Sequence, residues 1–165
     1  MDKQKYSDSI NRFAKNKTAY KILKMLYMGL PALVFVTYPV MLIIKGFLAL
    51  DRDFLFMLCI PAGTLVLVSL LRKIINRPRP YERFDTPPLF DRDGKGESMP
   101  SRHTSSAFII ATSALALNVW AGIGLLIIAA IIGLTRILSG VHYISDVLAG
   151  AGLSIIIGTV FFIIL

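Results

Sequence analysis

Residues 135–146 read TRILSGVHYISD, and they hold the only formally charged side chains between His103 and the last residue, Leu165. These charged residues are Arg136 and Asp146, with His142 between them. The flanking sequence is apolar over lengths that could cross a bilayer, where a charge costs roughly 2.5–3.5 kcal/mol on insertion scales. Charged residues at that depth normally face a cavity lined by protein, so the segment predicts a polar site within a membrane protein.

The spacing inside this segment indicates the chemistry. His142 and Asp146 are four residues apart and share one face if the segment is helical. A carboxylate one turn away accepts one ring N–H of the histidine and leaves the other nitrogen free to attack. Arg136 carries a permanent charge on a planar fork that fits phosphate. We therefore predict that His142 is a nucleophile held by Asp146, with Arg136 near a phosphate.

The composition is typical of an integral membrane protein. Hydrophobic residues make up 55% of the 165 residues, and the mean hydropathy is +0.68. The length predicts a single domain over residues 1–165. The net charge of +8 could suggest nucleic-acid binding, but the apolar segments leave no soluble domain to present such a face. We predict no nucleic-acid partner, and a homo-oligomer is compatible with the sequence.

Five apolar segments predict an all-α, polytopic bundle of about five transmembrane helices. They cover approximately residues 19–48, 54–71, 104–120, 121–138 and 143–165. Pro31 and Pro39 lie in the first segment, which we predict as one kinked helix because transmembrane helices tolerate proline. In the last segment, small residues recur every fourth position and predict close helix packing, namely Gly150, Ser154 and Gly158.

Two polar segments accompany these helices. Residues 1–18 combine several cations with Tyr6, Ile10 and Phe13 at roughly helical spacing. They predict either an amphipathic helix on the membrane surface or a frayed tail. Residues 72–103 are rich in proline, glycine and charge, and a loop of this length is usually functional or disordered. We predict that it is an active-site loop.

Three polar clusters lie at ends of the predicted helices: residues 72–80, 100–103 and 135–146. An up-and-down bundle would bring them to one membrane face, where several arginines could neutralise a transferring phosphoryl group. Ser101 stands where a helix N-cap would, so the backbone N–H groups after it could bind an anion. No carboxylate follows His103 four residues later in the sequence, as Asp146 follows His142, and His103 suits a general acid for the leaving oxygen. No metal-site pattern is present in the clusters.

The clusters resemble the motifs of the type 2 phosphatidic acid phosphatase family, the membrane lipid phosphate phosphatases related to vanadium haloperoxidases. That family carries K-x6-R-P, P-S-G-H and S-R-x5-H-x3-D. The chain has, in the same order, Arg72-x6-Arg79-Pro80, then Pro100-Ser101-Arg102-His103, then Thr135-Arg136-x5-His142-x3-Asp146. The resemblance implies a helical membrane bundle that acts on a lipid phosphate without metal or other cofactor.

The resemblance also implies a role for each motif residue. His142 would form a phosphohistidine, Asp146 would orient it, and His103 would protonate the leaving group. The phosphate would be held by Arg72, Arg79, Ser101, Arg102 and Arg136. Three positions depart from the family pattern. Arg72 replaces lysine, and Lys73 beside it could substitute; Arg102 replaces glycine, adding bulk and charge; Thr135 replaces serine and keeps the hydroxyl.

The sequence thus predicts a multi-pass enzyme of the cell membrane that hydrolyses a phospholipid phosphomonoester, of the phosphatidate or phosphatidylglycerophosphate type. The alternatives are an undecaprenyl pyrophosphate phosphatase, a vanadium-dependent peroxidase, and a non-catalytic lipid-headgroup binder or transporter. Lysine and arginine are dense before the first apolar segment, which favours a cytoplasmic N-terminus and site. In the family the site often faces outward, and an outward site could see undecaprenyl pyrophosphate instead.

Overall fold

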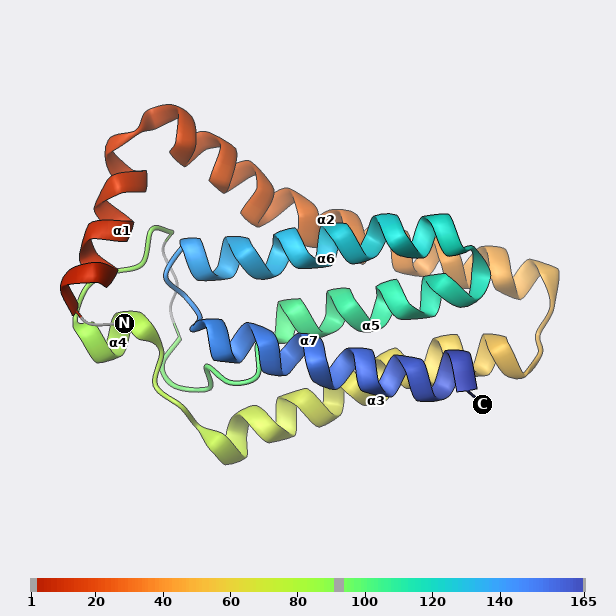
Figure 1. The fold of residues 1–165 in the computed structure, drawn as a ribbon. Helices are drawn as coiled ribbons and strands as arrows, with labels where there is room; N and C mark the ends of the chain where they lie inside the picture. Colours follow the sequence, from red (N-terminus) through yellow and green to blue (C-terminus); the bar gives the residue numbers. More distant parts are fainter. Residues whose placement is uncertain (1–2, 91–93, 165) are drawn as a thin grey trace.

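The computed structural model describes residues 3–90 and 94–164, and its regular structure there is entirely helical (Figure 1). The bundle consists of α2 (Lys17–Leu48), α3 (Arg52–Ile75), α5 (Arg102–Leu117), α6 (Val119–Leu138) and α7 (Ile144–Thr159), with a π-helical end, η1 (Val160–Ile164). Two shorter helices are α1 (Lys3–Lys15) and α4 (Pro80–Phe84). The predicted all-α class is confirmed. Residues 1–2, 91–93 and 165, which belong to the predicted surface helix, loop and last span, lie outside the described residues.

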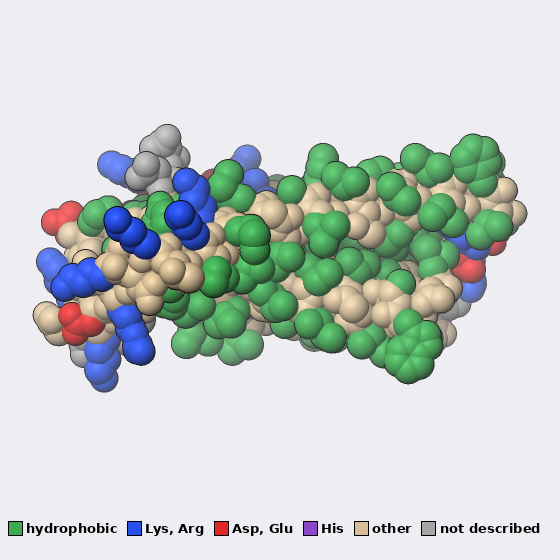
Figure 2. Space-filling view, turned by 90° about the horizontal axis from the view of Figure 1, so that it is seen from above, with side chains coloured by type: hydrophobic (Ala, Val, Ile, Leu, Met, Phe, Trp, Pro, Cys, Tyr) green, Lys and Arg blue, Asp and Glu red, His purple; other side chains and the backbone are tan. Residues whose placement is uncertain are grey.

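Four segments in the described part of the chain are long and apolar enough to cross a membrane: Lys17–Leu48, Arg52–Phe84, Val119–Leu138 and Ile144–Ile164. Their outer surfaces expose large apolar side chains, including Phe35 at 78% and Phe47 at 89%. Figure 2 shows hydrophobic side chains along most of the bundle and lysines and arginines mainly at one end. A continuous apolar surface of this kind is stable against lipid and not in water.

The fifth bundle helix, α5, differs from the predicted span 104–120. It has 16 residues and ends at Leu117, because Asn118 begins the next helix by accepting the Ala121 N–H through its side chain. Nine of the residues of α5 are buried, and it packs against α2, α3, α6 and α7. This helix is therefore the central element of the bundle, and Trp120 belongs to α6.

The small residues of α7 let it approach α5 closely, as predicted. A Cβ at Gly158 would lie 2.1 Å from Thr112 Oγ1, and a Cβ at Gly150 would lie 2.8 Å from Ser101 O. Between them, the hydroxyls of Ser154 and Ser105 are 2.6 Å apart. Together these contacts hold α7, whose first turn carries Asp146, against α5.

The helix ends bring the three polar clusters together. Helix α2 is continuous through both prolines, and the bundle helices alternate in direction, so α3 and α6 end where α5 and α7 begin (Figure 1). Backbone bonds then close the loop on this end: the Ser98 N–H donates to Arg77 O, and the Leu89 N–H donates to Ser139 O. The predicted convergence at one end of the bundle is confirmed.

The predicted amphipathic helix is present as α1, but its apolar face contacts protein. Tyr6 and Ile10 are buried and cluster with Phe84 of α4. The Tyr6 hydroxyl donates to Gly140 O over 3.0 Å. Sequence could not show that this face has a protein partner, because Gly140 is 134 residues away. In Figure 1, α1 runs across the end of the bundle.

Candidate active site

The centre of the site is the pair His142 and Asp146. Nδ1 of His142 lies 3.5 Å from Oδ2 of Asp146, and the residues are 2% and 0% exposed. The predicted pairing is present, although not within one helix. Helix α7 begins only at Ile144, since the Tyr143 N–H donates to Asp146 Oδ2 over 2.9 Å at the helix start. His142 therefore lies in the preceding turn, and one carboxylate oxygen serves both the histidine and the cap.

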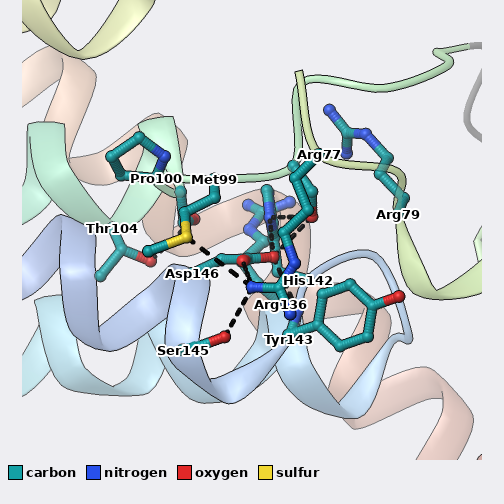
Figure 3. Close-up of polar contacts among 12 residues, drawn as sticks. Arg77, Arg79, Met99, Pro100, Thr104, Arg136, His142, Tyr143, Ser145 and Asp146 are labelled. Atoms are coloured by element: carbon teal, nitrogen blue, oxygen red, sulfur yellow. Dashed lines mark hydrogen bonds and ion pairs between the residues drawn. The ribbon is translucent and has the colours of Figure 1, made fainter. Parts of the chain in front are cut away.

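Two further side chains hold the Asp146 carboxylate. The Ser98 hydroxyl donates to Oδ2 and lies 3.5 Å from His142 Nδ1. Arg77 Nη1 lies 2.8 Å from Oδ1 and donates to Ser145 Oγ over 2.7 Å. Figure 3 shows the Arg77 side chain beside Ser145, Asp146 and the Tyr143 ring, whose centroid is 4.1 Å from the guanidinium carbon. Both carboxylate oxygens are thus fixed, with Oδ2 beside the histidine.

The surroundings of His142 keep its imidazole neutral. Burial lowers the pKa of His142 to about 4, although the hydrogen bond to Asp146 opposes this shift. The positive charges of Arg79 and Arg72 lower the pKa further. With Nδ1–H directed at the carboxylate, the lone pair is on Nε2. This is the state that a nucleophilic histidine needs at neutral pH.

Arg72 and Arg79 are buried at 4% and 3% exposure. Arg72, in the last turn of α3, donates to Pro100 O over 3.0 Å. Arg79 donates to Gly96 O through Nε over 3.0 Å. The Glu82 carboxylate of α4 accepts the backbone N–H of Arg79 at 2.9 Å and that of Gly96 at 2.7 Å. This carboxylate therefore ties the two ends of the loop together and fixes Arg79.

Ser101 is the N-cap residue of α5, as predicted, and is fully buried. Its hydroxyl makes no cap bond and instead accepts a hydrogen bond from Thr104 Oγ1 over 3.0 Å. Its backbone N–H donates to the Asp146 carbonyl over 2.9 Å. Ser101 thus joins the second cluster directly to the third.

Arg136, at 2% exposure, acts on the turn through its backbone. Its carbonyl oxygen accepts the N–H groups of Val141 and His142, at 3.2 and 3.3 Å. Its side chain extends to α2, where Nη2 donates to Tyr27 O over 2.8 Å and the guanidinium carbon lies 3.7 Å from the Tyr27 ring centroid. The structure therefore places the guanidinium against α2.

His103 lies in the first turn of α5. It is half-buried and lines a groove of about 230 Å³. The groove is otherwise mostly apolar and is formed by α2, α5 and α6, with Pro31, Val34, Phe35, Ala107, Ile110 and Ile132. Arg102 also lines it and is exposed. Lys73 is exposed on α3, so Arg72 is the member of this pair that reaches the second cluster.

The sequence reasoning missed Ser98 and left Arg77 undecided between a site residue and a flanking charge. Both are near predicted motifs, two positions before Arg79 and two before Pro100. Nothing in the spacing distinguishes Arg77 from a flanking membrane-end charge, and only the fold places it on Asp146. Among the described residues, no group of three or more His, Cys, Asp or Glu side chains could hold a metal ion.

Replacing Arg77 with glutamine should lower kcat by about tenfold to a hundredfold, the range seen when a residue that orients a functional ligand is removed in metal sites. Asp146 would lose its ion pair, and its carboxylate would turn more freely beside His142. Initial rates of phosphate release from detergent-solubilised protein would measure the loss. Lysine at position 77 should recover part of the rate, since it keeps the charge without the planar fork.

The matched control is Lys95→Gln, which removes an exposed cation from the same loop and should leave the rate unchanged. If Arg77→Gln were as active as this control, Ser98 and the Tyr143 N–H would be sufficient to hold Asp146, and Arg77 would have no positioning role.

Comparison with known proteins supports one family. A model of the PAP2 superfamily matches residues 52–165, whereas none of the curated proteins compared gives a significant match. A transmembrane PAP2 type phosphatidylglycerolphosphate phosphatase from Bacillus subtilis has a similar fold, with TM-score 0.69 and 24% identity over 96% of this chain and 83% of that chain. The LpxE structure from Aquifex aeolicus has TM-score 0.71 and 27% identity, covering 95% and 92% of the two chains.

The matched region includes all three motif clusters and more than half of the chain. The two similar structures extend the likeness over nearly the whole chain, including the N-terminal helices that the family model does not cover. With its apolar helices and the architecture that it shares with these two structures, this chain is an integral membrane protein, and it belongs to the PAP2 superfamily.

Proposed function

We propose that the chain is a phosphoric monoester hydrolase that releases phosphate from a membrane lipid through a phosphohistidine on His142. The observation that carries this proposal is the buried His142–Asp146 pair, which lies at the polar end of a membrane bundle under the positive charges of Arg72 and Arg79. Residues 1–165 would act as one phosphatase domain in the cell membrane.

In the first step, Nε2 of His142 attacks phosphorus. Asp146 accepts a hydrogen bond from Nδ1–H of the same ring and stabilises the positive charge that develops on it. The P–N bond forms as the P–O bond to the lipid breaks, and His103 donates its proton to the leaving oxygen. Arg72 and Arg79 neutralise the equatorial oxygens, helped by Ser101 and by Arg102 at the groove. Arg136 would join them by turning its guanidinium from Tyr27.

In the second step, a water molecule attacks the phosphohistidine. His103, now neutral, takes the proton of this water, the P–N bond breaks, and inorganic phosphate leaves with His142 restored. None of the residues in this scheme needs a metal ion or another cofactor for charge neutralisation, because the arginines supply it.

The groove beside His103 supports a lipid as the substrate. An acid that protonates the leaving oxygen must lie on the lipid side of the phosphorus, and the groove beside His103 is lined mainly by apolar residues of α2, α5 and α6. A hydrocarbon chain is the natural occupant of such a surface. The free phosphate would then leave toward the polar loop.

The test is phosphate release by purified protein in detergent with EDTA present. Phosphatidate, phosphatidylglycerophosphate and undecaprenyl pyrophosphate are offered in parallel. We expect release from the two phosphomonoesters, unaffected by EDTA and inhibited by vanadate, which adopts the five-coordinate geometry of the transferring phosphoryl group. A rate that EDTA abolishes would contradict the metal-independent mechanism. Preference for the pyrophosphate would overturn the phosphomonoester assignment, and no release from any of them would favour a non-catalytic headgroup binder.

A further inference from the structure

The N-terminal part of the chain carries a strongly basic surface. We define it by seven exposed cations of α1 and the first turns of α2: Lys3, Lys5, Arg12, Lys15, Lys17, Lys21 and Lys24. Asp8 is the one acidic residue among the described residues of this stretch. Figure 2 shows lysine and arginine side chains gathered at this end of the bundle.

The position of these cations matches the headgroup layer of a bilayer. Lys17, Lys21 and Lys24 are spaced by four and three residues, so they share one face of α2. That helix is a candidate membrane span, and its first two turns must therefore cross the interface. Exposed lysines at this depth of a membrane protein generally extend their ammonium groups to lipid phosphates. A hollow of about 620 Å³ lies between α1 and the start of α2, and its lining includes both Arg12 and the carboxylate of Asp8.

Helix α1 also packs closely against the turn that carries His142. Gly140 has a positive φ of 77°, and a Cβ there would lie 2.5 Å from the Tyr6 hydroxyl oxygen and 2.7 Å from Ile10 Cδ1. Tyr6 is 1% exposed, and its hydroxyl binds Gly140 O. Tyr6, Ser9 and Ile10 also line, with His142 and its neighbours, a partly open pocket of about 260 Å³. Displacement of α1 would therefore remove Tyr6 and Ile10 from Gly140 and expose the turn that carries His142 to more water.

We propose that the basic surface binds anionic phospholipids of the surrounding membrane and thereby keeps α1 docked on the turn that carries His142. A helix of 13 residues is marginal alone in water, and only two of its residues are buried in the bundle. Contact with the membrane surface would add stability to the docked state. The bound lipid is a membrane lipid other than the substrate. The face of α1 toward the site is formed by Tyr6, Ser9 and Ile10, whereas the cations are exposed.

The experiment uses the full chain in vesicles of phosphatidylcholine, with or without phosphatidylserine, at a fixed mole fraction of phosphatidate. We expect a rate about threefold to tenfold higher with phosphatidylserine, and loss of this difference in high salt. Hydrogen exchange of α1 and residues 139–143 should be slower with phosphatidylserine. The combined variant Lys15→Gln, Lys17→Gln, Lys21→Gln and Lys24→Gln should show neither difference, whereas Arg52→Gln, at the far end of the bundle, should keep both.

Two other outcomes would contradict the proposal. A lower rate with phosphatidylserine would mean that the basic surface collects the anionic substrate and that bystander lipid competes with it. Equal exchange of α1 in both vesicles would show that the surface does not bind anionic lipid. The exchange measurement needs no turnover, so it tests the surface even if the proposed phosphatase activity, on which the rate measurement rests, is not found.

Discussion

Replacement of His142 by alanine should reduce phosphate release by about 10⁴-fold or more, because no other side chain can take its place on phosphorus. The imidazole is buried, held by Asp146, and neutral through the lowering of its pKa to about 4. It is therefore available as a nucleophile down to mildly acidic pH. Phosphate release from a lipid phosphomonoester, followed in detergent, measures the loss.

A second variant separates chemistry from folding. His142→Asn keeps a donor near the Nδ1 position for Asp146 and fills most of the volume, yet it has no Nε2 nucleophile. It should be as inactive as the alanine variant while retaining the helical circular dichroism and thermal midpoint of the parent. Rapid quenching with labelled substrate should trap an acid-labile phosphoenzyme in the parent and none in either variant. Turnover by His142→Asn would exclude the covalent mechanism.

The fold could be predicted well from the sequence because a bilayer restricts it strongly. Apolar segments of sufficient length must become helices, since lipid offers no partners for backbone groups, and a chain of such helices alternates in direction. Two boundaries were predicted wrongly. The span predicted to end at residue 71 continues to Ile75, so Arg72 lies on α3 and not in the loop. The span predicted to reach residue 120 stops before Asn118, because an asparagine cap interrupts the apolar run there. The docking of α1 could not be predicted, since the contact of Tyr6 with Gly140 joins opposite ends of the chain.

The sequence predicts which residues of the site come together at the helix ends, but not where their long side chains extend. Motif spacing identified His142 with Asp146, and counting helices placed Arg72 and Ser101 beside them. Spacing contains no information on where long side chains extend. Arg77, which has the same charge as Lys73, reaches Asp146, whereas Lys73 is exposed. Arg136 lies over Tyr27 of α2. These differences depend on packing between residues far apart in the chain.

Replacing His103 with asparagine should slow the hydrolysis of phosphatidate by about 10²- to 10⁴-fold, the usual contribution of a positioned general acid. An alkoxide leaves poorly unless it is protonated, and His103 lines the groove that would hold the lipid. The loss should depend on the leaving group. With p-nitrophenyl phosphate, whose phenolate leaves without a proton, the first step should proceed at nearly the parental rate, as measured by release of p-nitrophenolate in stopped flow.

The rate of the second step shows whether His103 transfers protons or only binds the phosphate. Without a base to activate water, the His103→Asn phosphoenzyme should accumulate, giving a burst of about one p-nitrophenolate per enzyme and then slow turnover. His142→Asn should give no burst, because its first step cannot occur. If His103→Asn slowed both substrates equally and gave no burst, His103 would be binding phosphate, and the apolar groove beside it would no longer mark the leaving-group side of the site.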